Sequence, residues 1–274
     1  MPRRYSLSFL TCLDAPPPAA IRTARDAGYD CIGLRLLPAA PGGVSFPLMN
    51  DDALMQDTLA ALRDTGIEVF DVEIIRIAPG FSAAAYTGFF EAAARLGARS
   101  VLVVGDDADA ARMTASFAAL CEAAHPFGLS MDLEFMPQSE VHDAAAALRI
   151  LRGAGQPNAA VIVDALHVSR SRTPLAELGA IPPGWMNYAQ ICDGPAEIPT
   201  DRDGLNFAAR QARLLPGDGA IDLPALFARL PAGLPISVEV PNQAQAPVVG
   251  ALEWARQGLL RSKAAMAQAD ALRA

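Results

Sequence analysis

Positive charge is scarce in this sequence, and lysine is almost missing from it. Lys263 is its single lysine, and the formal net charge of the 274 residues is −8 at pH 7. A nucleic acid partner needs clustered lysine and arginine, so this composition argues against one. The remaining basic residues are arginines spread along the chain, each suited to a point contact with a carboxylate, hydroxyl or phosphate.

Paired cysteines and long apolar runs are also missing. The cysteines Cys12, Cys31, Cys121 and Cys192 show no C-x-x-C spacing. We therefore expect free, buried thiols and a cytoplasmic protein rather than disulfides. No run approaches the roughly 18 apolar residues of a membrane span, so no membrane partner is expected. Residues 1–13 lack a signal-peptide cleavage site and are interpreted as a first strand.

Apolar residues, in contrast, are abundant. They make up 52% of the sequence against 19% charged residues, which favours a large core and argues against wholesale disorder. The length permits either one α/β barrel of about 250 residues or two smaller domains. No linker of distinct composition and no internal repeat divides the chain, so residues 1–274 are interpreted as a single domain.

Strand-like and helix-like patterns alternate along the whole chain. Short β-branched runs predict strands, and stretches bounded by Asp, Asn, Gly or Pro predict helices. The expected strands are residues 5–10, 31–37, 68–77, 100–104, 130–135, 160–164, 187–192 and 235–240. The expected helices are residues 19–27, 51–63, 82–96, 109–125, 140–152, 174–178, 223–230 and 247–271, with long loops at 39–49 and 194–220.

This alternation indicates a single (β/α)8 TIM barrel, because strands that alternate with helices require parallel pairing and right-handed crossovers. A doubly wound open sheet is the alternative. It is disfavoured because no G-x-G-x-x-G motif follows the first strand, where residues 10–14 read L-T-C-L-D instead.

Four predicted strands carry a lone oxygen donor in an otherwise apolar run. These donors are Glu134, Asp164, Gln190 and Glu239, on the fifth to eighth strands. Strand ends share one mouth in a barrel, where unpaired carboxylates repel and a divalent cation relieves the repulsion. The oxygen-rich set favours one divalent ion, Mn²⁺ first and then Mg²⁺, Co²⁺ or Zn²⁺. For any one of the four, an interior ion pair or hydrogen bond is the alternative.

A histidine follows the second of these donors closely. His167 stands three residues after Asp164, so one turn of loop or helix sets its imidazole beside a bound ion rather than on it. There it can hold a substrate hydroxyl or carbonyl, or carry a proton near neutral pH. The alternative is a structural hydrogen bond from its Nδ1 to the backbone.

Motifs at these positions resemble those of a known family. Glu134 lies in L-E-F-M-P, Asp164 and His167 in D-x-x-H, Gln190 before I-C-D-G-P, Glu239 in S-V-E-V-P, and residues 213–222 read R-L-L-P-G-D-G-A-I-D. Over nearly the whole chain this set is similar to the xylose isomerase-like TIM-barrel superfamily, in particular its sugar phosphate isomerase/epimerase branch. The resemblance implies a metal held by both glutamates, Asp164 and Gln190, with His167 contacting the substrate.

Gln190 departs from the pattern of that branch. Many members carry histidine at the third ligand position, and the glutamine is similar instead to the ligand set of the 3-dehydroshikimate dehydratase branch. The endonuclease branch uses a His-rich three-metal cluster, which a chain with three histidines does not supply. The resemblance therefore implies an isomerase or epimerase, with a dehydratase as the alternative.

The same residues imply a mechanism for either activity. Glu134 and Glu239 are expected to form an acid–base pair that acts on a keto sugar, sugar phosphate or related polyhydroxy carbonyl compound via an enediolate. Dehydration of a cyclic keto acid such as 3-dehydroshikimate, or of an inosose, begins with the same proton removal. A barrel that binds metal or ligand without turnover is a third hypothesis, against which the two candidate bases argue.

Further residues are candidates for binding this small-molecule substrate. Arg35 and Arg76 end the second and third strands, near Glu73, and inward-facing arginines there would bind a carboxylate or phosphate. A rim ion pair between Glu73 and one arginine is the alternative. Arg213 is the best candidate in the loop 194–219, which is long enough to act as a lid. The apolar face of the last helix predicts either a homo-oligomer or packing on its own barrel.

Overall fold

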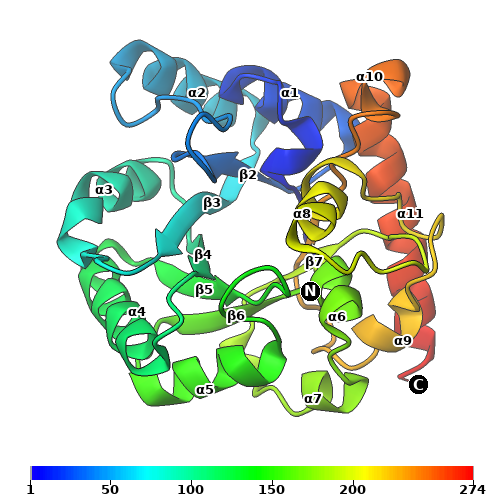
Figure 1. Ribbon diagram of the computed structural model, residues 1–274. Coiled ribbons are helices and arrows are strands. Elements are labelled where there is room, and N and C mark those ends of the chain that lie inside the picture. Colours follow the sequence, from blue (N-terminus) through cyan, green and yellow to red (C-terminus); the bar gives the residue numbers. More distant parts are fainter. Residues whose placement is uncertain (1, 274) are drawn as a thin grey trace.

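The chain folds into a closed parallel barrel. In the computed structural model, which describes residues 2–273, eight strands pair in chain order and the last pairs with the first (Figure 1). This confirms the predicted (β/α)8 TIM barrel. The strands are β1 Tyr5–Leu7, β2 Cys31–Arg35, β3 Glu68–Ile77, β4 Ser100–Gly105, β5 Ser130–Glu134, β6 Ala159–Asp164, β7 Ala189–Ile191 and β8 Ile236–Val238.

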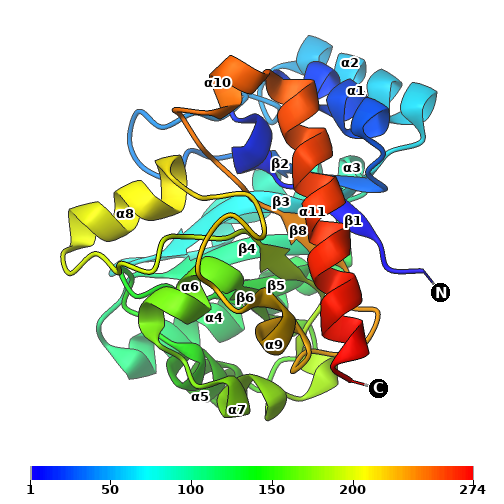
Figure 2. The same ribbon diagram turned by 90° about the vertical axis from the view of Figure 1, so that its right-hand side faces the viewer.

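Helices surround the barrel and cover one side of its mouth. They are α1 Pro17–Ala27, α2 Asp52–Thr65, α3 Thr87–Arg95, α4 Ala110–Ala124, α5 Ala144–Ala154, α6 Ala165–Ser171, α7 Leu175–Gly179, α8 Arg202–Gln211, α9 Leu223–Phe227, α10 Ala246–Val249 and α11 Ala251–Ala271. Helix α8 projects from the face of the barrel opposite the two chain termini (Figure 2). Among residues 2–273, no helix is long and apolar enough to cross a membrane.

Aspartates begin several of these helices and glycines end others. Asp51, Asp109 and Asp143 accept hydrogen bonds from backbone N–H groups in the first turns of α2, α4 and α5. Gly28 and Gly66 end α1 and α2 with φ of +91° and +73°, a conformation that a side chain would strain. Local sequence therefore sets these boundaries, and the predicted ends at both glycines are confirmed.

Two predicted helices are divided in the structure. Residues 82–96 form a 3-10 helix, Ala83–Tyr86, followed by α3. The last helix is divided at Gly250, whose φ is +87°, into α10 and α11. At Gly250 the positive φ with an extended ψ of 144° breaks the helical backbone, so the apolar pattern alone overestimates the length of this last helix.

Two further helices are absent from the sequence prediction. Asp164 both ends β6 and caps α6, because its Oδ1 accepts the backbone N–H of His167 at 3.0 Å. The predicted loop 194–220 contains α8, which Asp201 caps. Ala209 is the one buried residue of α8, so this helix lacks the apolar stripe by which helices are predicted.

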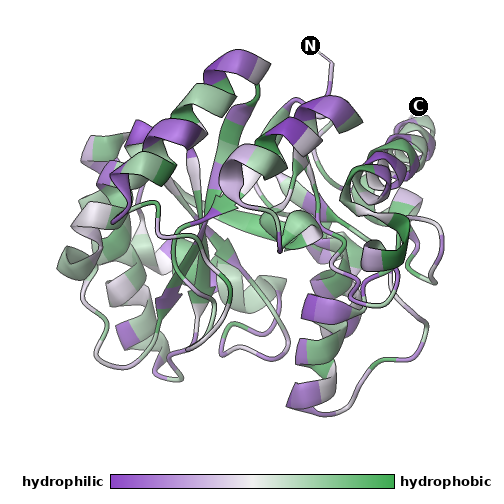
Figure 3. Cartoon of the chain, turned by 90° about the horizontal axis from the view of Figure 1, so that it is seen from above, coloured by the Kyte–Doolittle hydropathy of each residue, from purple (hydrophilic) through white to green (hydrophobic). Residues whose placement is uncertain are grey.

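The hydrophobic core lies both inside the barrel and between the strands and the helices. Figure 3 shows hydrophobic residues along the strands and hydrophilic residues on the outer faces of the helices. Inside the barrel, a separate buried cluster consists of Ile74, Leu102, Val104, Ile162 and Tyr188. Full burial of one such side chain contributes roughly 1.5–3 kcal/mol. The strands are thereby fixed, and their carboxyl ends share one mouth.

The apolar face of α11 packs on its own barrel. Trp254, Leu259 and Met266 are buried, and the indole N–H of Trp254 donates to the carbonyl of Val240 at 2.9 Å. Of the two interpretations of this face from the sequence, packing on its own barrel is therefore the one that the structure shows. A homo-oligomer remains a prediction.

One buried aspartate organises the turn between α8 and α9. Asp193 accepts three backbone N–H groups at 2.8–3.0 Å, those of Gly194, Gly217 and Ile221. Gly219 packs so closely that an added Cβ would overlap the carboxylate of Asp193 and the carbonyl of Gly194. The P-G-D-G segment, which begins three residues after Arg213, is thus fixed to the end of β7.

Replacing Gly219 by alanine should destabilise the protein by about 1–3 kcal/mol, because the new methyl group has no space beside Asp193. Gly88→Ala in α3 is the matched control, since an added Cβ there meets nothing within 4 Å. The control should stay within about 0.5 kcal/mol of the parent protein. Urea unfolding followed by circular dichroism measures both changes, and equal stabilities of the two variants would contradict the crowding at Gly219.

Candidate metal and substrate site

Four buried polar side chains lie at the carboxyl ends of neighbouring strands. Glu134 and Asp164 are the last residues of β5 and β6, Gln190 lies in β7, and Glu239 directly follows β8. Asp164 pairs in register with Gln190, and Gln190 with Ser237. The four side chains are buried. The structure therefore brings together at one mouth the residues that the sequence predicts as metal ligands.

A single arginine links two of these carboxylates. Nη1 of Arg213 lies 2.6 Å from Oδ2 of Asp164, and Nη2 lies 2.8 Å from Oε2 of Glu239. Its Nε donates to the carbonyl of Ala209 in α8 at 2.7 Å. Burial is the largest single influence on Asp164 and would raise its pKa, but the charge and hydrogen bond of Arg213, together with the contacts of His167, outweigh it, so the pKa lies below its ordinary value. Arg213 is itself only 2% exposed, so this link is an interior one.

The other oxygen of Glu239 also accepts hydrogen bonds. Its Oε1 accepts the hydroxyl of Ser8 at 2.7 Å and the amide of Gln190 at 3.1 Å. Burial raises the pKa of Glu239 to about 7, although Arg213 opposes this shift. Glu239 is therefore held in place from three sides, and its carboxyl group holds a proton more strongly than an ordinary glutamate does.

Three side chains form a group that could hold a metal ion. One atom each of Glu134, Asp164 and His167 lies within 4.8 Å of the others. This group includes His167, which is predicted from the sequence to lie beside the ion rather than on it, and among residues 2–273 it does not include the predicted ligand Glu239. Oε1 of Glu134, Nδ1 of His167 and Oε1 of Gln190 have no hydrogen-bond partner within residues 2–273, which is unfavourable for buried polar atoms. Oxygen and imidazole donors of this kind suit Mn²⁺, Co²⁺ and Zn²⁺. The residues present thus fit a divalent ion.

The pKa of Glu134 lies well above its ordinary value. Burial is the main cause, and the negative charges of Glu239 and Asp164 add to it. Unlike Glu239, Glu134 has no ion pair with an arginine among the described residues. Two carboxyl groups in unequal environments, both holding protons more strongly than usual, are suited to accept and return a proton.

His167 lies in the first turn of α6, directly beside this group. Its Nε2 is 3.8 Å from Oε1 of Glu134. Burial lowers the pKa of His167 to about 4, so the imidazole is neutral at pH 7 and the contact is not an ion pair. Within the described part of the chain its Nδ1 has no hydrogen-bond partner, so the backbone hydrogen bond left open by the sequence is not formed there. The neutral ring lines the cavity described below.

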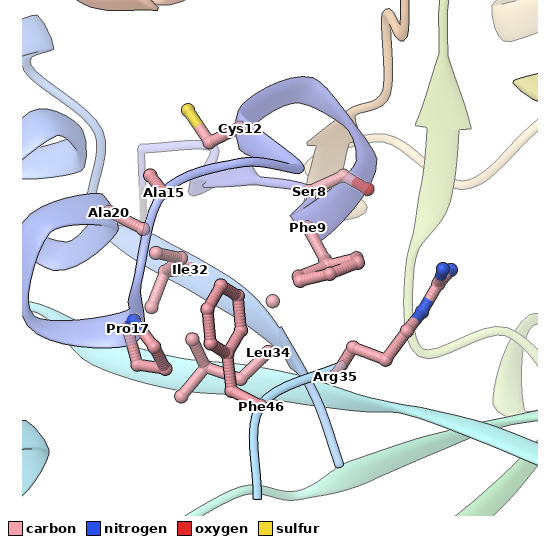
Figure 4. Close-up of a pocket in the computed structure, with 11 residues that line it drawn as sticks. Ser8, Phe9, Cys12, Ala15, Pro17, Ala20, Ile32, Leu34, Arg35 and Phe46 are labelled. Atoms are coloured by element: carbon pink, nitrogen blue, oxygen red, sulfur yellow. The ribbon is translucent and has the colours of Figure 1, made fainter. Parts of the chain in front are cut away.

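The arginines at the ends of β2 and β3 already have acidic partners. Nη2 of Arg35 lies 2.5 Å from Oε2 of Glu73, and its guanidinium stands 4.5 Å from the ring centroid of Phe9. Figure 4 shows Arg35 reaching away from the apolar pocket that Phe9 helps to form. Arg76 is paired with Asp106. The ion pair between Glu73 and one arginine, left as an alternative by the sequence, is therefore present.

One cavity of about 770 Å³ connects these residues. Glu134, His167, Arg213 and Glu239 line it, together with Arg35, Glu73 and Arg76. Helix α8 and the loop between β2 and α2 contribute further walls. Every predicted substrate-binding residue thus borders the same cavity as the two candidate bases.

Sequence reasoning missed two features of this cavity. Ser8, which follows β1, holds Glu239, and no sequence pattern distinguishes such a serine from any other polar residue after a strand. Arg202, Asn206 and Arg210 also line the cavity, from one side of α8. Their spacing of four residues is a signal for one helix face, which becomes visible once Asp201 is recognised as a helix cap.

Solved structures share this fold over nearly the whole chain. The IOLI protein with a bound zinc atom is 18% identical and has a TM-score of 0.79, with 97% of this chain and 98% of that chain covered. An L-ribulose 3-epimerase is 17% identical with a TM-score of 0.71, covering 100% and 99%. The probable 3-DHS dehydratase AsbF from Bacillus anthracis, involved in petrobactin synthesis, is 14% identical with a TM-score of 0.71, covering 94% and 98%.

A longer solved protein contains a similar barrel as one of its parts. It is a fusion of a xylose isomerase-like TIM barrel and a 4-hydroxyphenylpyruvate dioxygenase, 19% identical, with a TM-score of 0.80. The match covers 98% of this chain and 43% of that chain, so this chain spans less than half of the fusion protein. At these identities the structural likeness shows the fold alone.

A family model adds evidence from the sequence itself. No curated protein matches the chain. The model described as xylose isomerase-like TIM barrel, in contrast, matches residues 21–263, which include all four strand-end donors. Because this match covers most of the sequence and the barrel is closed as the family requires, the chain belongs to the xylose isomerase-like TIM barrel family.

Proposed function

We propose that the protein is a divalent-metal-dependent isomerase or epimerase of a small polyhydroxy carbonyl compound, such as a keto sugar or sugar phosphate. One observation carries this proposal. Glu134 and Glu239, two glutamates with raised pKa values, border one cavity next to a group that could hold a metal ion. The L-ribulose 3-epimerase of the same fold supports the choice of chemistry.

The proton transfer is assigned to the two glutamates. Glu134 comes from β5 and Glu239 from the end of β8, so a substrate between them presents different faces to the two carboxyl groups. One carboxylate removes the proton next to the carbonyl group, and the other carboxyl group returns a proton to the opposite face. Epimerisation returns it to the same carbon, and isomerisation returns it to the neighbouring carbon.

The metal site supports this transfer. Glu134, Asp164, Gln190 and Glu239 would hold the divalent ion, which when bound supplies positive charge beside the carbonyl oxygen. The neutral ring of His167 is assigned to a substrate hydroxyl or carbonyl group. We assign to Arg213 the positioning of Asp164 and Glu239, on the basis of its two ion pairs.

A dehydratase of a cyclic keto acid or an inosose is the second candidate. The observation that favours it is Gln190, which stands at the third ligand position as in the dehydratase branch that the sequence resembles. The similarity in fold to the probable 3-DHS dehydratase AsbF supports it as well. Here a glutamate removes the same proton, the electron pair forms a carbon–carbon double bond, and the other glutamic acid protonates the leaving hydroxyl, which departs as water.

Protein dialysed against Mn²⁺ and then against metal-free buffer should retain about one ion per chain. Glu134→Gln should weaken this binding at least about tenfold, because it removes one negative charge from the donor set. Glu140→Gln, an exposed glutamate outside the cavity, is the control and should bind like the parent protein. Elemental analysis and calorimetric titration measure the binding. Absence of bound ion in both would refute the metal site.

The reaction is tested by NMR. The metal-loaded protein is incubated in deuterated water with keto sugars, sugar phosphates and 3-dehydroshikimate. Deuterium incorporation without loss of water indicates an isomerase or epimerase, and a new conjugated product indicates the dehydratase. Glu239→Gln should slow either reaction by about 10²-fold or more, because the variant side chain cannot carry the proton. Glu140→Gln should react at the parent rate. Neither deuterium incorporation nor a conjugated product with any of these compounds would contradict both candidates.

A further inference from the structure

One side of α8 presents a basic, polar face to the cavity. Arg202, Asn206 and Arg210 follow one another at intervals of four residues, so they lie along one side of the helix. All three line the cavity that contains Glu134 and Glu239. Figures 1 and 2 show α8 beside the mouth of the barrel, at the end remote from the chain termini.

The arginines of this face differ from the other arginines of the cavity. Those others are each paired with an acid: Arg35 with Glu73, Arg76 with Asp106, and Arg213 with Asp164 and Glu239. Within residues 2–273, the side chains of Arg202 and Arg210 have neither an ion pair nor a hydrogen bond. Both arginines are exposed residues that line the cavity, so their guanidinium donors are free for a ligand.

The charged groups around Arg210 are mainly positive. Arg210 is an exposed residue. Desolvation by neighbouring atoms, and then the positive charges of Arg76, Arg35 and Arg202, lower its pKa, while Asp106 is the acid that opposes them. Asp106 is already paired with Arg76. A guanidinium among like charges gains most from a ligand that brings a negative charge of its own.

We propose that Arg202, Asn206 and Arg210 form a subsite for a carboxylate group of the substrate. Arg210 provides the two parallel N–H donors of a forked contact, and Asn206 provides an amide on the same face. The proposal rests on the proposed function for one point, namely that the rest of the substrate reaches Glu134 and Glu239. It narrows the substrate class from polyhydroxy carbonyl compounds in general to those that carry an acid group.

A carboxylate fits this face better than a phosphate does. Phosphate groups commonly bind to the backbone N–H groups at a helix N-terminus, but Asp201 caps that end of α8 and Asp203 follows in its first turn. These two acids would repel a dianion. The cavity instead meets the side of the helix, where planar guanidinium groups match the planar fork of a carboxylate.

Shikimate, a cyclic trihydroxy carboxylate, and its uncharged methyl ester form a matched pair of probes for isothermal titration calorimetry. The parent protein should bind the acid at least about tenfold more tightly than the ester. Arg210→Gln should weaken binding of the acid about 10- to 100-fold and leave binding of the ester unchanged. Arg63→Gln, which removes an exposed positive charge on α2 outside the cavity, should bind both probes like the parent protein.

Several outcomes would overturn the proposal. The first two are equal binding of acid and ester by the parent protein, and no binding of the acid at millimolar concentration. A third is that Arg210→Gln weakens binding of both probes equally although its circular dichroism spectrum is unchanged. A fourth is that inorganic phosphate displaces the acid at a lower concentration than acetate does. Binding is measured without turnover. Loss of the subsite is therefore distinguishable from failure of the proposed reaction, which the deuterium experiment reports with neutral sugars as well as acids.

Discussion

Burial of three carboxyl groups in one mouth is the constraint on which the site depends. Arg213 gives one positive charge to two of them, Asp164 and Glu239, and leaves Glu134 without a cation. Removing an ion from water costs on the order of several kcal/mol, so such an arrangement persists only where packing fixes the partners. The barrel supplies this fixed frame, because its strands are buried on both faces.

The barrel and its strand-end donors were predictable because both are marked by differences between neighbouring residues, apolar within a strand and polar at its end. A strand buried on both faces appears as a short β-branched run, in which a single polar residue is conspicuous. The bounds of β3, Glu68–Ile77, coincide with the predicted range, and Asp164 ends β6 as predicted. Once the alternation fixes the topology, the closed barrel itself brings distant strand ends to one mouth.

The partners of the side chains were not predictable in this way, because they depend on distances of a few ångströms between separate elements. Glu73 had two candidate arginines in the sequence, and Arg35 is its partner because the two residues stand opposite each other in register. Arg213 has the sequence context of a substrate ligand, yet its donors are directed to Asp164, Glu239 and α8. Neither pairing can be recognised from the residues next to these arginines in the sequence.

The hydrogen bond from Arg213 to Ala209 joins α8 to the buried carboxylates. The segment between β7 and α9 therefore has two parts, the basic face of α8 and the buried cation of Arg213 two residues after the helix. Any change to the helix must keep this arginine in place, because its loss would leave Asp164 and Glu239 uncompensated. Grafting this segment from another barrel would succeed only if the graft brought an equivalent arginine with it.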